Sequence, residues 1–321
     1  MDDEYNKNIE AIVSYLKKGE CKSKGQKIGL ELEHFLVDKE SLKTEGYFGE
    51  RGVRELMEKL EPYYDEKVYV DGAFLGLTRK DAYITLEPAS QLEVSIAAKE
   101  NISQLSQAYQ RFSREIEPLL RNRGLQLCYT GYHPVSKIAE LQIIPKRRYA
   151  YMAEYLKSTG RYALNMMKGT CSAQVSIDYS SEADFMEKFR LANCLSPVLY
   201  FLTDHTAVFE GEPAADSMVR ARIWDEVDPA RCGVVPGALD APFGYRDYAR
   251  YIYERPAVVT KVGEELRSTG GTPLCQVFQG RQMREDEVEY ALGMFFPDVR
   301  VKTYLELRMA DSMPPAETLG Y

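Results

Sequence analysis

Residues 28–33 alternate strictly between aliphatic and other side chains. The aliphatic residues are Ile28, Leu30 and Leu32, and the residues between them are Gly29, Glu31 and Glu33. A period of two is typical of a half-buried β-strand, because successive side chains of a strand point to opposite faces. The two carboxylates therefore share one face, with Cα atoms about 6.6 Å apart. A chain built on such a strand must cover one face of a sheet and leave the other face polar.

Three later segments have the same layout. They are residues 82–97, 169–180 and 299–309. The first predicts two strands that flank a turn at Pro88–Ser90, and each of the others predicts a single strand. Their polar faces carry Glu87, Glu93, Thr170, Gln174, Glu306 and Arg308. We therefore expect several acid-bearing strands to join in one sheet.

The remaining segments predict helices and loops. Helical periodicity appears at residues 6–20, 50–60, 98–122, 145–156, 244–255 and 284–294. Ser181 with Asp184 predicts the start of a long apolar helix that reaches about residue 208, and we expect this helix to be buried. Residues 211–243, rich in Pro, Gly and Asp, predict an ordered loop. Without regular βαβ alternation, the pattern predicts an α+β fold with an antiparallel sheet, in one domain spanning residues 1–321.

Composition narrows the function classes. Lys and Arg total 41 against 49 Asp and Glu, a net charge of −8 that does not favour nucleic-acid binding. The six cysteines have no zinc-ligand spacing, so we expect reduced thiols. The first ten residues are polar and acidic, and no run of about 18 apolar residues occurs. These features predict a cytoplasmic protein with no membrane partner.

The acids of the polar faces need partners. Carboxylates gathered within about 4 Å repel by roughly 4 kcal/mol per pair at an effective dielectric near 20. Either they spread out on a solvated outer sheet face, or cations lie between them. Oxygen ligands without His or Cys favour Mg²⁺ or Mn²⁺. Because Mg²⁺ usually takes one or two carboxylates and completes its shell with water and phosphates, several acids point to a bound nucleotide triphosphate.

Two basic clusters could hold phosphate or carboxylate groups. Arg220 and Arg222 lie two residues apart in what we expect to be an extended stretch, and Arg231 follows. Guanidinium groups bind such anions bidentately, although ordinary surface arginines are an equal alternative. Residues 146–148, Lys-Arg-Arg, begin a predicted helix whose N-terminal amides also attract anions, with a solvated surface as the alternative.

Several motifs resemble a known family. They are GLELE, ITLEPASQLEVS, MMKGTCSAQVSIDYSSEADFMEKFR, RARIWDEVDPARCG and FFPDVRVKTYLELRMAD. In this order, from about residue 26 to residue 312, they closely resemble the plant- and proteobacterial-type glutamate–cysteine ligases. The resemblance implies a glutamine-synthetase-like fold, in which helices pack on the outer face of a curved antiparallel sheet. Its concave face would hold ATP, divalent metals and the amino-acid substrates.

The resemblance also implies roles for single residues. The metal-binding acids would be Glu31, Glu33, Glu87, Glu93 and Glu306. We expect Arg220 and Arg222 to act in catalysis, Thr170, Gln174, Arg220, Trp224 and Arg308 to bind the substrates, and Lys146 and Arg231 to bind the nucleotide. ATP would phosphorylate the side-chain carboxylate of glutamate, and the amine of cysteine would attack the γ-glutamyl phosphate.

The chain departs from the family pattern at two places. Ala89–Ser90 replaces the usual pair of glycines in LEPGGQ, and the family normally continues with a helical region where this chain ends at Tyr321. Three alternatives therefore stay open. The first is ligation to another amine, the second is a truncated non-catalytic paralogue that binds nucleotide or glutamate, and the third is a carboxylate-pair hydrolase.

Overall fold

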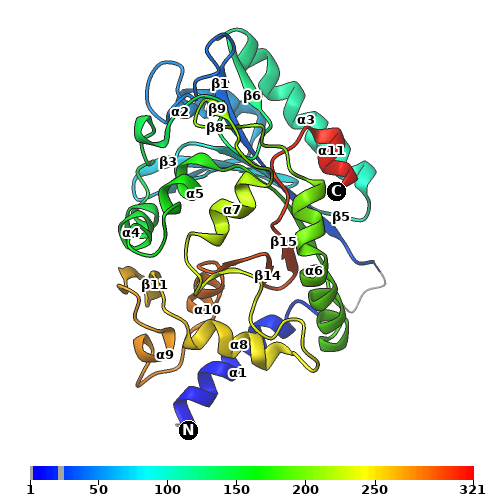
Figure 1. Ribbon diagram of the computed structural model, residues 1–321, viewed down its shortest axis with the longest axis vertical. Coiled ribbons are helices and arrows are strands. Elements are labelled where there is room, and N and C mark those ends of the chain that lie inside the picture. Colours follow the sequence, from blue (N-terminus) through cyan, green and yellow to red (C-terminus); the bar gives the residue numbers. More distant parts are fainter. Residues whose placement is uncertain (1–2, 21–24) are drawn as a thin grey trace.

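The computed structural model describes residues 3–20 and 25–321. A nine-stranded antiparallel sheet forms the centre of this described part (Figure 1). Its strands are β1 (Ile28–Asp38), β2 (Glu66–Val70), β3 (Ala73–Arg79), β4 (Ala82–Leu86), β5 (Leu92–Lys99), β6 (Leu125–Cys128), β7 (Ala173–Ile177), β14 (Val299–Val301) and β15 (Leu305–Leu307). The order is β14, β15, β7, β1, β5, β4, β3, β2, and β6 pairs with the end of β1. The predicted α+β class with an antiparallel sheet is confirmed.

Helices and short strands surround the sheet. The helices are α1 (Asp3–Lys17), α2 (Val53–Leu60), α3 (Ile102–Arg121), α4 (Arg147–Leu156), α5 (Ala163–Gly169), α6 (Glu182–Leu202), α7 (Val219–Asp225), α8 (Tyr245–Glu254), α9 (Leu274–Val277), α10 (Glu285–Leu292) and α11 (Pro315–Gly320), with 3-10 turns η1 (Glu61–Tyr63) and η2 (Ile138–Glu140). The short strands are β8 (Val208–Phe209), β9 (Glu212–Pro213), β10 (Cys232–Gly233), β11 (Val259–Val262), β12 (Glu265–Ser268) and β13 (Phe296–Pro297).

Helices α2 and α3 cover the aliphatic face of the sheet. Leu32 on β1 and Val94 on β5 lie opposite each other, and both are buried in one core with Phe112 of α3. This packing agrees with the amphipathic pattern of α3, whose first turn is capped by the Asn101 side chain. The opposite face of the same strands is therefore free to carry polar groups.

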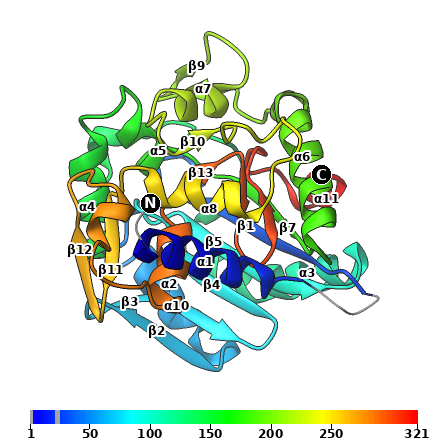
Figure 2. The ribbon, with the colours of Figure 1, turned by 90° about the horizontal axis from the view of Figure 1, so that it is seen from below.

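A second hydrophobic core lies below the sheet in Figure 1. It joins α1, α6, α8 and α10 through buried residues that include Ile12, Phe185, Tyr248 and Leu292. Figure 2 shows α1 lying across α8 and α10. The single domain predicted from the sequence stays a prediction.

Residues 299–309 form a hairpin, so the predicted single strand is wrong. The chain reverses at residues 302–304, where the backbone N–H of Lys302 donates to the carbonyl of Tyr304, and β14 pairs with β15. Alternation cannot reveal this reversal, because the side chains of both arms keep their period of two. The hairpin places Arg300 directly opposite Glu306. In a single strand these two residues would lie about 20 Å apart.

Two expectations about the segment from residue 181 to residue 225 are also corrected. Helix α6 begins where Ser181 caps it, as predicted, but it ends at Leu202 and only one of its sides is buried. The second half of this helix, residues 191–202, has no charged residue on any side, whereas neighbouring elements cover one side only. The stretch around Arg220 and Arg222 is helix α7 rather than an extended strand, and it lies inside the predicted loop. Side chains two residues apart on a helix point in different directions.

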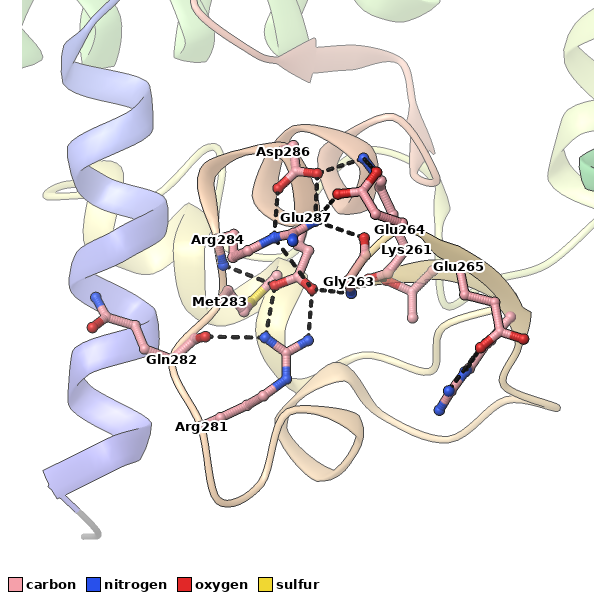
Figure 3. A network of polar contacts seen from close by, with 12 residues as sticks. Lys261, Gly263, Glu264, Glu265, Arg281, Gln282, Met283, Arg284, Asp286 and Glu287 are labelled. Atoms are coloured by element: carbon pink, nitrogen blue, oxygen red, sulfur yellow. Dashed lines mark hydrogen bonds and ion pairs between the residues drawn. The ribbon is translucent and has the colours of Figure 1, made fainter. Parts of the chain in front are cut away.

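A polar network fastens the β11–β12 hairpin to the start of α10 (Figure 3). Glu287 is fully buried and accepts hydrogen bonds of 2.9 and 2.6 Å from the guanidinium of Arg281. It also accepts from the backbone N–H of Gly263, at 2.7 Å, and of Arg284, at 2.8 Å. One carboxylate thus joins the hairpin, the preceding loop and the helix N-terminus.

Candidate active site

A cavity of about 300 Å³ opens on the polar face of the sheet. Strands β1, β4, β5 and β7 form one wall, and α4, α5, α7, the β14–β15 hairpin and the segment 293–296 contribute to the other walls. Four of the predicted metal-binding acids line it, namely Glu31, Glu33, Glu87 and Glu93. The fifth acid, Glu306, is fully buried behind the lining.

Strand register explains why the acids gather. Glu33 on β1 lies opposite Glu93 on β5, and Glu93 in turn lies opposite Thr85 on β4. Glu31 lies opposite Gln174 on β7. Residues that lie opposite each other on neighbouring strands point to the same face of the sheet. The polar residues of the four strands therefore form one continuous polar surface.

The acids stand in an unfavourable environment for negative charge. Burial, together with the charges of Glu93 and Glu306, raises the pKa of Glu31 to about 8. Burial and the charges of Glu87 and Glu93 likewise raise the pKa of Glu33 to about 8. Burial also raises the pKa of Glu93, against the hydrogen bonds from Thr85 and Ser95. A bound cation would relieve this repulsion.

The donor set fits Mg²⁺ in kind, since all four lining acids offer hard oxygen ligands to one cavity. Within residues 3–20 and 25–321, however, no group of three or more His, Cys, Asp or Glu side chains is arranged as a ready-made metal centre. The metal-binding roles therefore stay predictions.

Glu306 is surrounded by three cations. Its carboxylate lies 2.7 Å from Arg300, 3.0 Å from Arg308 and 3.5 Å from Lys302. Burial by itself would raise the pKa of Glu306, but these cations hold it well below the ordinary value. Arg300, Lys302 and Arg308 all line the cavity, and we call them the basic wall. Glu306 lies behind this wall and forms an ion pair with each of the three. The sequence reasoning missed Arg300, because only the hairpin turn brings it to this wall.

Gln174 joins the basic wall to the acids. Arg308 donates a 2.5 Å hydrogen bond to the Gln174 amide oxygen, and the amide nitrogen donates one of 3.1 Å to Glu33. The backbone N–H of Ser172 also donates to Glu33, at 2.6 Å. Both oxygens of Glu33 are thus held, and the orientation of Gln174 is fixed from both ends.

Helix α7 brings Arg220 and Trp224 to the cavity. Arg220 donates to the carbonyls of Met309 and Arg308, at 2.8 and 2.9 Å, which fixes the chain after β15. In the described part of the chain, Arg220 Nε and Trp224 Nε1 are buried donors without a hydrogen-bond partner. Arg222 points away from the cavity and forms a half-exposed ion pair with Asp216.

Of the two residues predicted to bind the nucleotide, Lys146 and Arg231, only one lies at the cavity. Lys146 lines the cavity, as does Arg148, whose buried Nε has no partner among the described residues. The expected anion site at the start of α4 is filled by the protein itself, because the backbone N–H of Arg147 donates to Asp71. Arg231 is fully buried, pairs with Asp228 at 2.6 Å and does not line the cavity.

Thr170 lies in the cavity wall, as expected, but its hydroxyl donates to the Met166 carbonyl at 2.7 Å. The apolar part of the lining contains Met152, Met166, Met167 and Phe296. This apolar wall was not anticipated, because its residues come from three separate segments, α4, α5 and β13. The cavity therefore combines acids, cations and a soft apolar surface.

Sequence comparison assigns the chain to a family. The protein-family model described as glutamate–cysteine ligase family 2 matches residues 27–320. The chain belongs to this family. The glutamate–cysteine ligase, chloroplastic, of Nicotiana tabacum is 31% identical over 315 residues, which cover 95% of this chain and 59% of that enzyme. The Arabidopsis thaliana enzyme of the same name is 30% identical over 314 residues, with coverage of 95% and 59%.

The chain thus spans about three fifths of the length of these glutamate–cysteine ligase relatives. A crystal structure of the Francisella tularensis glutamate–cysteine ligase in complex with AMP covers 91% of this chain and 62% of its own, with a TM-score of 0.49 and 12% identity. None of the helices in the described residues has the length and apolar character to cross a bilayer. The cytoplasmic location stays a prediction.

Proposed function

We propose that the chain joins the γ-carboxylate of glutamate to the amine of cysteine, using ATP and Mg²⁺. The observation that supports this most is the division of one cavity into an acidic wall and a basic wall, connected through Gln174. A reaction between a triphosphate, an amino acid and an amine needs both walls. Family membership supports the same chemistry.

The acidic wall is the proposed Mg²⁺ site. Glu31, Glu33, Glu87 and Glu93 would hold the metal, which would offset the charge of the triphosphate. Lys146 and Arg148 would hold the phosphate oxygens from the α4 side of the cavity. Phosphoryl transfer depends mainly on positioning and charge stabilisation, so no protein nucleophile is required.

The basic wall is the proposed glutamate site. The unpaired donors of Arg220 and Trp224, together with the Arg308 guanidinium, would bind the α-carboxylate of glutamate. Its γ-carboxylate would then attack the terminal phosphorus of ATP and release ADP. The acceptor amine would attack the γ-carbonyl carbon, form the amide bond and displace phosphate. The methionine-rich wall suits a thiol-bearing acceptor, because thioethers pack well against sulfur and apolar groups.

The test is ADP release by the folded chain with Mg²⁺, glutamate and cysteine, each omitted in turn. We expect release to require all three together with ATP. Replacing cysteine by other amines separates the proposal from ligation to a different acceptor. Thermal stabilisation by ATP or glutamate without any turnover would instead support the non-catalytic paralogue.

A further inference from the structure

The hydroxyl of Tyr149 lies between an acid and a cation of the candidate active site. Tyr149 comes from the first turn of α4, lines the cavity and is buried. Its hydroxyl accepts a hydrogen bond from the Lys146 ammonium and donates one to Oε1 of Glu87, both at 3.3 Å. It thus connects a residue proposed to hold phosphate with a residue proposed to hold Mg²⁺.

Lys146 and Glu87 depend on this hydroxyl. In the described part of the chain, the Lys146 ammonium forms no ion pair, and its hydrogen bond to Tyr149 is the only one it makes. The Glu87 carboxylate likewise accepts a hydrogen bond from Tyr149 alone among the described residues. Glu33, by contrast, is held by both Ser172 and Gln174. One side chain therefore orients both an acid and a cation that nothing else orients.

The hydroxyl can release both groups without being left unpaired. A phenol has one proton to donate, and the carbonyl oxygen of Leu86 is a second acceptor, also at 3.3 Å. The proton can therefore turn from Glu87 to Leu86 when the carboxylate binds a cation. The Lys146 ammonium has three protons and also lies over the Tyr149 ring, 4.4 Å from its centroid. It can turn toward a phosphate oxygen and keep its contact with the ring.

The backbone fixes the position of Tyr149 itself. The N–H of Ile144 donates to the carbonyl of Pro88 at 2.9 Å, which ties the segment before α4 to the turn after β4. The N–H of Tyr149 donates to the carbonyl of Lys146, also at 2.9 Å. The three residues that share the hydroxyl are thus mounted on two segments that are bonded to each other.

We propose that Tyr149 is a positioning residue for the magnesium–nucleotide complex, and that its hydroxyl sets the Lys146 ammonium and the Glu87 carboxylate in place before the ligand binds. Groups that are held in position lose less side-chain freedom on binding than mobile groups do. This inference rests on the proposed function, which assigns phosphate and Mg²⁺ to this part of the cavity. In the described residues no hydrogen bond joins Tyr149 to the basic wall, so glutamate binding should not depend on it.

Isothermal titration calorimetry of the full chain with adenylyl imidodiphosphate, a non-hydrolysable ATP analogue, tests the proposal in excess Mg²⁺. Tyr149→Phe keeps the ring and removes the hydroxyl. We expect the variant to bind the analogue about tenfold more weakly, because hydrogen bonds to two charged groups are lost. Glutamate, titrated separately, should bind within about twofold of the unaltered chain, which also shows that the variant is folded. In turnover, the KM for ATP should rise and the KM for glutamate should not.

The matched control is Tyr151→Phe, the same change on the same helix. Tyr151 does not line the cavity, and its hydroxyl has no hydrogen-bond partner in the described part of the chain. This variant should bind the analogue and glutamate as the unaltered chain does.

A second comparison asks whether Tyr149 acts through Lys146. In a chain that already carries Lys146→Gln, Tyr149→Phe should weaken binding of the analogue less than it does in the unaltered chain, because part of its effect is exerted on the missing ammonium. A purely structural role would give the same loss in both backgrounds.

Several results would overturn the proposal. They are unchanged binding of the analogue by Tyr149→Phe, an equal loss of affinity for the analogue and for glutamate, and an undiminished effect of Tyr149→Phe beside Lys146→Gln. An unaltered chain that does not bind the analogue would contradict this inference and the proposed function together. If the analogue binds with the expected differences but no ADP is released from ATP, the proposed ligation fails and the role of Tyr149 stands.

Discussion

The amide nitrogen of Gln174 donates a 3.1 Å hydrogen bond to Oε1 of Glu33, across the β7–β1 pairing. Both residues are buried, and the other end of the Gln174 amide accepts from Arg308. Gln174→Leu would leave a buried acid, Glu33, and a partly buried cation, Arg308, each short of one partner. We expect the free energy of unfolding in urea to fall by about 1–3 kcal/mol. Gln110→Leu, at an exposed position of α3, is the control and should change it little.

The two arginines expected to bind anions differ in position, and this difference can be tested. Arg308 lies in the cavity wall between Glu306 and Gln174, whereas Arg222 pairs with Asp216 at the surface. We expect Arg308→Lys to lower kcat/KM about 100-fold, because lysine lacks the planar fork. Arg222→Lys should leave it within about twofold. Equal losses in the two variants would contradict the assignment of Arg308 to the glutamate site.

The buried acids predict an unusual pH dependence. The pKa of Glu31 and of Glu33 is raised from the ordinary value of 4.5 to about 8 in the folded state. Between these two pH values the folded chain therefore binds more protons than the unfolded chain. Without metal, stability should therefore fall as pH rises from about 5 through about 8. Mg²⁺ should restore it most at the alkaline end. Melting temperatures across this range, with EDTA and with Mg²⁺, measure both effects, and a metal-free chain that gains stability with pH would contradict them.

Ser90 stands where the family usually has glycine, and its backbone is in the left-handed region with φ of 74°. Its hydroxyl is buried and has no partner in the described part of the chain. Ser90→Gly removes both penalties, and we expect a gain of about 0.5–1 kcal/mol in the free energy of unfolding. Ala89→Gly is the matched control, because Ala89 does not have a positive φ and gains nothing from glycine. A destabilised Ser90→Gly chain would rule out strain at this turn.

Glu287 holds the β11–β12 hairpin against α10 (Figure 3). Burial alone would raise its pKa, but the hydrogen bonds from Arg281 and the two backbone N–H groups lower it overall. Glu287→Gln should therefore destabilise the chain by about 1–3 kcal/mol at neutral pH. The stabilising effect of a lowered carboxyl pKa is lost as pH falls, so the difference from the unaltered chain should shrink in acid. Glu289→Gln, exposed on the same helix, should behave like the unaltered chain at both pH values.

Local sequence patterns predicted much of the candidate site. The alternation around Glu31, Glu33 and Glu93 correctly assigned these acids to one polar face, because a period of two is a property of the strand itself. Alternation also assigned Gln174 and Arg308 to polar strand faces, and both line the cavity. Helix starts were also predictable where a side chain caps the first turn, as Ser181 does for α6.

Other features depended on long-range pairing. Arg300 joins the basic wall only because the chain reverses at residues 302–304, and the alternation of the strand is the same with or without that turn. Arg220 and Arg222 separate only because α7 is a helix that packs with one side toward the cavity. The exposed face of α6 likewise depends on how many neighbours are available to cover it.

The sequence by itself determined which residues lie on the polar faces of the strands and which family the motifs resemble, because both depend on side chains close together in the chain. The tertiary structure alone decided that four glutamates share one cavity, that Glu306 anchors three cations behind its wall, and that Arg231 is buried with Asp228 elsewhere. The physical reason is that register, turns and burial set distances between residues far apart in sequence, and those distances fix charge interactions.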